Sequence, residues 1–361
     1  MKRLRMAVIG VGHLGKEHAR ILAGLPNVDL VGVADVNRDQ AEAVARNLGT
    51  QAFGDFWPLL NLVDAASIAV PTTYHVAVAR EFLRRGISLL VEKPLALDVA
   101  GAEELIGFAK ESGAVLQVGH IERFNPAFEE LQRRTIRPLL IRAQRVGPFT
   151  GRSTDIGVVL DLMIHDLDLL LTLAGSPVQS VSALGMSVFG GHEDVASVRL
   201  TFSSGCVAEV MASRASAAPS RVMQIWASEG YAELDFAQRR ITLVQPSESV
   251  RKHGLDPARL DPASRARLRE ELFGRHLHAR VIDGGACDQL TVELQEFVNA
   301  VRDGDRPRVA GEDGRNAIAL AGEILQQIRT HAWEGSTGAG PLQLPPPLGL
   351  LFSGSPAQAV A

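Results

Sequence analysis

From residue 6 to about residue 119, short apolar runs rich in β-branched residues alternate with longer helical segments, and this alternation constrains the fold more than any other feature. Such a pattern is typical of a parallel sheet whose helices cover both faces. It predicts strands at 6–10, 28–35, 66–70, 88–92 and 115–119, with helices near 13–25, 39–48, 74–85 and 98–112. The first third of the chain is therefore expected to be a doubly wound α/β domain.

After residue 124 the rhythm changes. A long apolar helix is predicted near 156–174, followed by strand-like runs at 178–188, 196–203, 206–214, 222–227, 232–236 and 241–244, and by helices near 262–273, 290–302 and 312–330. Short turn signals between the runs favour a large, mostly antiparallel open sheet. The predicted fold class is α/β, with an N-terminal Rossmann domain at 1–122, a C-terminal α+β domain at 123–333 and a loose tail at 334–361.

Composition excludes several classes of protein. The 37 Lys and Arg residues stand against 41 Asp and Glu, a net charge of −4, without the basic excess that nucleic-acid binding requires. The apolar helix near 156–174 contains three aspartates and a histidine, so no membrane span is expected. The two cysteines lack partners at metal-site spacing. A cytoplasmic protein without a metal site is predicted.

A glycine-rich fingerprint follows the first predicted strand and opens a helix. Its residues are Gly10, Val11, Gly12, His13, Leu14 and Gly15. In a G-x-G-x-x-G turn the first glycine permits the tight turn, the second lets the backbone approach a pyrophosphate, and the third allows close packing of helix on sheet. The helix N-terminus then supplies N–H donors to the anion. These six residues are predicted to bind a dinucleotide.

Asp35 closes the second predicted strand, twenty positions after Gly15. A carboxylate there can accept hydrogen bonds from the adenosine ribose hydroxyls and repels a 2′-phosphate, which favours NAD over NADP. Arg38, three residues later, is the one nearby group that could receive that phosphate. The alternative is a glycine turn in an α/β fold that binds no nucleotide.

Lys93 stands in the sequence Val-Glu-Lys-Pro at the end of another predicted strand, on the sheet edge where α/β folds bind ligands. The following proline holds the lysine extended. Its ammonium could donate to a substrate hydroxyl and stabilise the oxyanion that forms as the proton leaves. An ordinary surface lysine at a turn is the alternative.

On the apolar helix, Asp161, His165, Asp168 and Thr172 form a narrow polar stripe at helical spacing. A carboxylate four residues before a histidine can orient an imidazole that works as a general base. The alternative is a core histidine at a domain boundary. A metal site is disfavoured, because two or three ligands on one helix leave the coordination sphere incomplete.

Together these motifs resemble the glucose-fructose oxidoreductase/inositol dehydrogenase/MocA (Gfo/Idh/MocA) family. The resemblance rests on the fingerprint at 10–15, Val-Pro-Thr-Thr-Tyr-His at 70–75, Glu-Lys-Pro at 92–94, the Asp161-x-x-x-His165 helix and Val-Ala-Gly-Glu-Asp-Gly-Arg-Asn-Ala-Ile at 309–318. It implies hydride transfer between NAD(P) and a sugar-like secondary alcohol, and an open sheet that forms the interface of a homodimer or homotetramer. It further implies a catalytic trio of Lys93, Asp161 and His165, with Pro71, Thr72, His75, Glu92 and Pro94 near the cofactor.

The segment 117–126, Gln-Val-Gly-His-Ile-Glu-Arg-Phe-Asn-Pro, is similar to one in family members that oxidise UDP-N-acetylglucosamine at C3. This resemblance implies a nucleotide-sugar substrate bound by Lys93, His120, Glu122, Arg123, Asn125 and His165. Arg123 offers a planar fork to phosphate or sugar oxygens. A hinge whose charges pair with one another is the alternative for these residues. For the whole protein the alternatives are a dehydrogenase of a free sugar or inositol, and a non-catalytic NAD-binding regulator.

Overall fold

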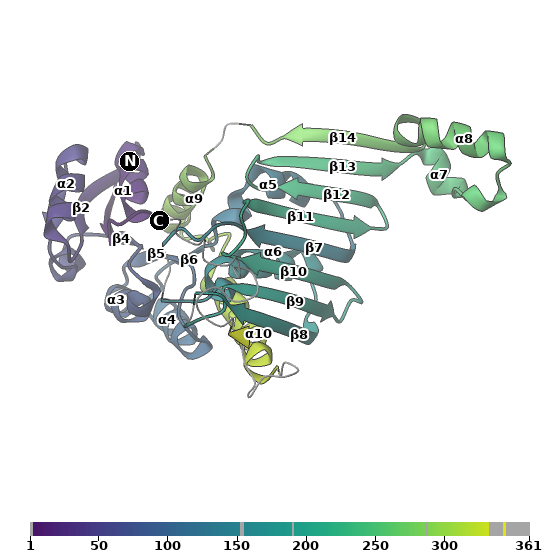
Figure 1. Ribbon diagram of the computed structural model, residues 1–361. Coiled ribbons are helices and arrows are strands. Elements are labelled where there is room, and N and C mark those ends of the chain that lie inside the picture. The colour runs from purple at the N-terminus through teal and green to yellow at the C-terminus, as the bar shows by residue number, and fades with distance from the viewer. Residues whose placement is uncertain (1–2, 152–154, 190, 286–287, 332–341, 344–361) are drawn as a thin grey trace, which may run out of the picture. The chain divides into compact units, whose positions relative to one another are not determined.

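The computed structural model describes residues 3–151, 155–189, 191–285, 288–331 and 342–343 (Figure 1). The chain forms two compact units, one of residues 1–124 with 287–322 and the other of residues 125–286 with 323–361. The predicted tail at 334–361 lies outside the described residues apart from 342–343, and so does Cys287. Each unit is built around its own sheet.

The sheet of the first unit is entirely parallel, with strand order β3-β2-β1-β4-β5-β6. This is the order of a Rossmann fold and confirms the predicted class. Its strands are β1 (Leu4–Ile9), β2 (Val28–Ala34), β3 (Gln51–Phe53), β4 (Ala65–Ile68), β5 (Ser88–Glu92) and β6 (Leu116–Gly119). Every residue of β4 and β5 is buried, as expected of central strands covered on both faces. The sequence missed β3, an edge strand of three residues.

Helices of the first unit are α1 (Gly15–Gly24), α2 (Arg38–Leu48), α3 (His75–Leu83), α4 (Val99–Ser112) and α9 (Gln289–Asp303). Asp98 caps α4 through Gly101 N–H, and Asn37 caps α2, whose first turn contains Asp39. Although α9 comes late in the sequence, it belongs to this unit because its apolar face packs in the same core as α1 and β1. The first unit therefore draws part of its core from residues near 290–300.

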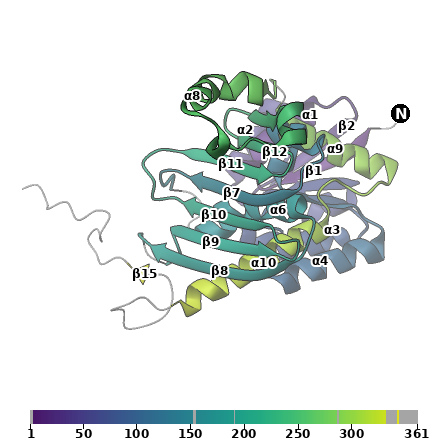
Figure 2. The same cartoon turned by 90° about the vertical axis from the view of Figure 1, so that its right-hand side faces the viewer.

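The second sheet has nine strands in the order β14-β13-β12-β11-β7-β10-β9-β8-β15 (Figures 1 and 2). It is antiparallel except for the β7–β10 and β8–β15 pairs. The strands are β7 (Pro138–Val146), β8 (Val178–Ser187), β9 (Val195–Phe202), β10 (Val207–Ser213), β11 (Ser220–Ala227), β12 (Gly230–Asp235), β13 (Arg240–Pro246), β14 (Leu277–Asp283) and β15 (Leu342–Gln343). The predicted large, mostly antiparallel sheet is confirmed.

In the part of the chain that the structure describes, helices pack against one face of this sheet (Figure 2). Along β10 the residues Ala208, Val210 and Ala212 are buried, while their neighbours Val207, Glu209 and Met211 are half-exposed. The helical elements are α5 (Pro126–Gln132), a π turn (Val159–Met163), α6 (Ile164–Ala174), α7 (Glu248–His253), α8 (Pro262–Glu271) and α10 (Gly311–Thr330), whose second half belongs to this unit. The strict alternation marks a sheet with a second, open face.

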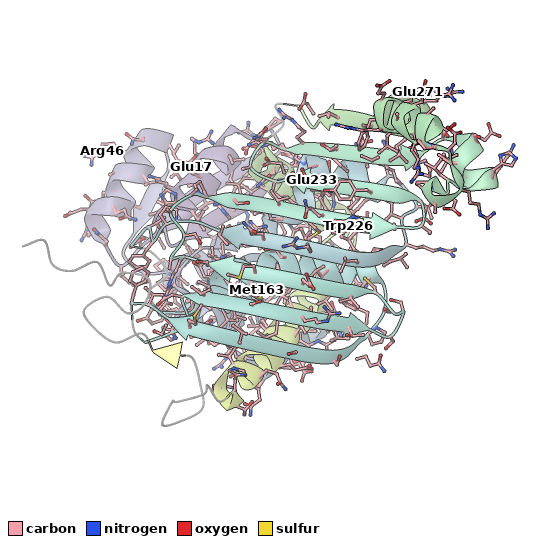
Figure 3. All side chains as sticks on the ribbon, turned by 45° about the vertical axis from the view of Figure 1, so that its right-hand side comes forward. Glu17, Arg46, Met163, Trp226, Glu233 and Glu271 are labelled. Carbon is pink, nitrogen blue, oxygen red and sulfur yellow. The ribbon has the colours of Figure 1, made fainter. Side chains whose placement is uncertain are left out.

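Several sequence predictions for this unit were wrong in detail. The strands β7 and β14 and the helices α5 and α7 were missed. β14 is exposed on both sides along most of its length, so it lacks the apolar alternation that marks a strand. The charged residues between β13 and β14 form α7 and α8 at one end of these two strands, and Glu271 of α8 is labelled in Figure 3. Among the described residues, no helix is both long enough and apolar enough to cross a membrane.

Candidate active site

The glycine turn after β1 has the shape that a dinucleotide requires. Gly10 has φ +83°, and a Cβ there would lie 2.8 Å from the backbone of Ala69 and Val70. A Cβ on Gly15 would overlap the Gly10 carbonyl oxygen, whereas one on Gly12 would meet nothing within 4 Å. Gly10 and Gly15 are thus needed for packing, whereas Gly12 leaves open space next to the backbone before α1. This cradle fits the pyrophosphate of NAD, which would lie at the helix N-terminus.

Asp35 is fixed directly behind this turn. One carboxylate oxygen accepts a hydrogen bond from Val11 N–H at 2.8 Å, and the other accepts one from Asn37 N–H at 2.8 Å. Arg38 lies on α2 and pairs with Glu42 at 2.9 Å. A half-exposed carboxylate at the end of β2 suits ribose hydroxyls and opposes a 2′-phosphate.

The ends of β4 and β5 are joined through His75, a buried residue at the start of α3. Its two ring nitrogens lie 2.9 Å from the carbonyl oxygens of Val70 and Pro94. Burial lowers the pKa of His75, and these backbone contacts oppose that shift. The histidine therefore clamps the turn after β4 to the Glu-Lys-Pro turn that carries Lys93.

Glu92 contacts His18, a fully buried residue of α1. The sequence did not predict a role for this histidine. The Nε2 atom of His18 lies 3.1 Å from Glu92 Oε1, and its Nδ1 lies 2.8 Å from Ser67 Oγ. The other Glu92 oxygen accepts Lys93 N–H at 3.3 Å. Burial raises the pKa of Glu92, but the hydrogen bond and charge of His18 outweigh it and leave that pKa below its usual value. His18 lies three residues after Gly15, so its place on the fingerprint helix was the available signal.

In the second unit, Asp161 lies in the π turn and His165 in the first turn of α6, both half-buried. The prediction of one uninterrupted α-helix from residue 156 was wrong, because a π turn at Val159–Met163 precedes α6. Glu193 holds the backbone where this turn begins. Val158 N–H donates to the Glu193 carbonyl at 3.0 Å, and Val159 N–H donates to its carboxylate at 3.1 Å. The first N–H groups of this helical segment are thus satisfied by a residue more than thirty positions away.

Gly157 is required at this entrance, since a Cβ there would overlap the Glu193 carboxylate. Burial raises the pKa of Glu193. Next to it, the Nε atom of Arg214 donates to Asp194 at 2.6 Å, and an Nη1 hydrogen bond of 3.0 Å reaches the Ile156 carbonyl. These contacts fix the chain just before the Asp161–His165 segment.

A second buried ion pair fixes α6 from the sheet side. Arg145 of β7 donates to both oxygens of Asp166 at 2.9 and 3.0 Å, and both side chains are almost fully buried. The guanidinium also lies over the ring of Phe236, 5.6 Å from its centre. Because Asp166 follows His165 in the chain, this fork sets the rotation of the helix turn that presents the histidine.

Comparisons with known proteins agree with this architecture. Residues 4–120 match the model described as "Oxidoreductase family, NAD-binding Rossmann fold", and residues 137–233 match the "GFO/IDH/MocA C-terminal domain". The chain is 37% identical over 326 residues to UDP-N-acetylglucosamine 3-dehydrogenase of Acidithiobacillus ferrooxidans, covering 90% of this chain and 97% of the relative. The chain belongs to the Gfo/Idh/MocA family.

Two further similarities support this membership. A crystal structure of the Acidithiobacillus ferrooxidans enzyme has a TM-score of 0.79 at 35% identity, covering 91% of this chain and 98% of that one. The scyllo-inositol 2-dehydrogenase (NAD(+)) of Bacillus subtilis strain 168 is 32% identical over 233 residues, covering 59% of this chain and 68% of that relative. This Gfo/Idh/MocA protein is therefore an oxidoreductase with an NAD-binding Rossmann domain.

The predicted residues of this Gfo/Idh/MocA chain fall into groups within each unit. The first unit gathers the fingerprint and Asp35 at the ends of β1 and β2, and gathers Pro71, Thr72, His75, Glu92, Lys93 and Pro94 at the ends of β4 and β5. In this parallel sheet these strands are neighbours, so their carboxyl ends share one edge. The second unit holds Asp161 and His165.

The predicted substrate segment divides at the boundary between the units. His120, Glu122 and Arg123 are buried in the first unit, where Arg123 lies 3.7 Å from Asp313. Asn125 is buried in the second, where it caps α5 and donates to the Phe236 carbonyl at 3.1 Å.

Proposed function

We propose that this protein is an NAD-dependent dehydrogenase that oxidises a ring hydroxyl of a nucleotide sugar, converting UDP-N-acetylglucosamine to its 3-keto form. The glycine cradle backed by Asp35 supports the cofactor class. Similarity over 97% of a UDP-N-acetylglucosamine 3-dehydrogenase is the single observation that carries the choice of substrate.

In this proposal the chain's own residues handle the proton and the developing charge. His165, oriented by Asp161, takes the hydroxyl proton as general base. Lys93 donates a hydrogen bond to the same oxygen and stabilises its negative character. When bound, NAD supplies the nicotinamide carbon that accepts the hydride. The buried ion pairs at Asp166 and Asp194 keep the histidine segment in one conformation before substrate arrives.

We assign binding of the nucleotide sugar to Lys93, His165 and the segment that contains His120, Glu122, Arg123 and Asn125. Arg123 is the one guanidinium in this set and suits a diphosphate, for which it would exchange its long contact with Asp313. NAD and UDP-sugars are both cytoplasmic metabolites, so the cytoplasm is the proposed site of action.

We further propose that the open face of the second sheet joins copies of the chain into a homodimer or homotetramer. A hollow of about 810 Å³ on this face is lined by Arg142, Arg199, Glu209, Met211, Gln224 and Glu233 among others. Both signs of charge occur there, with Arg199 and Glu209 paired at 2.9 Å. Figure 3 shows Trp226 and Glu233 on adjacent strands of this sheet. A face that pairs with its own copy needs such self-complementary chemistry.

The direct test is to mix purified protein with NAD and UDP-N-acetylglucosamine and to follow NADH absorbance. We expect this substrate to reduce NAD, and we expect N-acetylglucosamine and myo-inositol to reduce little of it. The inositol arm matters because a relative named scyllo-inositol 2-dehydrogenase is 32% identical. If inositol reduces NAD and UDP does not inhibit this reaction, the result would instead support a dehydrogenase of a free sugar or inositol. No reduction by any of several UDP-sugars would refute the substrate assignment.

A further inference from the structure

Buried beneath the Glu-Lys-Pro turn of the first unit is a group of polar side chains that the proposed chemistry does not use. It contains His18 on α1, Ser67 on β4, Glu92 on β5, Gln117 on β6 and Glu293 on α9. His18, Ser67, Gln117 and Glu293 have no solvent exposure, and Glu92 has 9%. His18, Glu92 and Glu293 are titratable, and a buried charge is costly unless it is paired. The protonation state of each therefore has to be explained.

Glu293 is the least satisfied member of this group. Neither of its carboxylate oxygens has a hydrogen-bond partner among the described residues, and the same holds for Gln117 Oε1. The only bond that ties the residue to the group runs through its backbone, whose carbonyl accepts Gln117 Nε2–H at 3.2 Å. An ionised carboxylate without donors in a dry interior is far less stable than the neutral acid.

The charged groups that act on Glu293 are two other acids, Glu92 on β5 and Glu296 on α9. Burial and the nearby Glu92 raise the pKa of Glu293 well above its usual value, and Glu296 on the same helix adds to the effect. Glu296 itself accepts a hydrogen bond from Arg308 N–H at 2.9 Å. The positive partners, His18, Lys93 and His75, act on Glu92. Glu92 therefore holds the negative charge that these groups favour.

We propose that Glu293 is a neutral carboxylic acid that positions Lys93 by keeping a single negative charge, on Glu92, beneath the Glu-Lys-Pro turn. With only one carboxylate ionised, Glu92 bonds both His18 and the main-chain N–H of Lys93. Ionisation of Glu293 at alkaline pH places a second negative charge in the same apolar space and loosens that arrangement. The positioning role rests on the proposed function of Lys93, while the charge state of Glu293 does not.

The first experiment measures thermal unfolding of the full chain between pH 5 and pH 9 for wild type and Glu293→Gln. A carboxyl with a raised folded-state pKa contributes stability that is complete below its unfolded pKa and is lost as pH rises through the folded value. The Tm advantage of Glu293→Gln should therefore grow with pH, to roughly 2–4 °C at pH 9. Glu111→Gln, an exposed change of equal charge on α4, should stay parallel to wild type. Parallel curves for Glu293→Gln would overturn the proposal.

Infrared spectroscopy of the wild-type protein tests the same proton even if Glu293→Gln folds poorly. At neutral pH we expect the carbonyl band of a buried protonated carboxylic acid. This band should persist in Glu193→Gln, which removes another buried acid whose pKa is raised by burial. Where Glu293→Gln folds, the band should be missing. A wild-type spectrum without such a band at pH 7 would contradict the neutral acid.

The role in positioning is decided by a pH profile. The ratio of kcat/KM at pH 9 to that at pH 7 should be at least about threefold higher in Glu293→Gln than in wild type, with Glu111→Gln unchanged. Superimposed profiles would refute the positioning role. If no sugar reduces NAD, the proposed function fails, whereas the thermal and infrared results still decide the charge of Glu293.

Discussion

The two units bury their charges in different ways. In the second unit two buried aspartates each face an arginine, with N–O distances of 2.6 Å for Arg214–Asp194 and 2.9 Å for Arg145–Asp166. In the first unit the buried acids Glu92 and Glu293 face no buried arginine among the described residues, and a histidine is the nearest base. Arginine stays charged at any physiological pH, whereas histidine and buried carboxyls titrate.

This difference suggests a division of labour. The Arg145–Asp166 and Arg214–Asp194 pairs near Asp161 and His165 contain cations that stay charged at physiological pH. The group around Glu92 can gain or lose a proton, so the Lys93 turn responds to pH. The same chain thus combines a rigid acid–base segment with a titratable support for its cofactor unit. The following changes test that contrast, beginning with the largest expected effect.

Replacing His165 by Ala should separate the chemistry of the second unit from cofactor binding by the first. Loss of the general base should lower kcat by roughly 10² to 10⁴. NAD affinity, measured by fluorescence titration, should change little because the glycine cradle lies in the first unit. His253→Ala, on α7, is the matched control. Normal turnover in His165→Ala would assign the base to another residue.

Replacing Arg214 by Met should leave Asp194 buried without its cation. Breaking a buried pair in this way costs about 3–5 kcal/mol of unfolding free energy. Denaturant unfolding at pH 7 measures this loss against wild type. Arg199→Met breaks the exposed Arg199–Glu209 pair and should cost less than about 1 kcal/mol. Equal losses for the two variants would show that burial does not govern this pair.

The glycine turn permits a matched comparison between packing and binding. Gly15→Ala forces a Cβ onto the Gly10 carbonyl and should destabilise the fold by about 1–3 kcal/mol. Gly12→Ala meets no neighbour and should change stability by less than about 1 kcal/mol. Its NAD affinity should nevertheless fall about tenfold, because the methyl group occupies the space of the pyrophosphate. Unchanged NAD affinity in Gly12→Ala would contradict the proposed cradle.

The smallest effect is expected at Arg38. Its guanidinium is 81% exposed and pairs with Glu42, so Arg38→Ala should alter the preference for NAD over NADP by less than about twofold. Asp35→Ser removes the carboxylate that opposes a 2′-phosphate and should reduce the same preference about tenfold. Ratios of kcat/KM for the two cofactors measure both. If the cofactor preference changed strongly in Arg38→Ala and not in Asp35→Ser, Arg38 rather than Asp35 would determine the choice between NAD and NADP.

Local signals predicted much of the first unit. The predicted bounds of β5 agree with the structure to the residue. Predictions failed where the deciding contact is distant. The long helix begins as a π turn whose first N–H groups donate to the distant Glu193, and β7 joins the sheet although its strand carries the buried Arg145. Hydrophobic periodicity does not report such partners.

The sequence by itself determined the glycine turn, the acid at Asp35 and the succession of strands and helices, because each depends on backbone conformation or on side-chain periodicity within a few residues. Only the tertiary structure decided that His18 supports Glu92, that Glu193 shapes the entrance to the histidine segment, and that Glu293 is buried beside another acid. Burial and electrostatic potential are sums over groups far apart in the chain. No short stretch of sequence contains them.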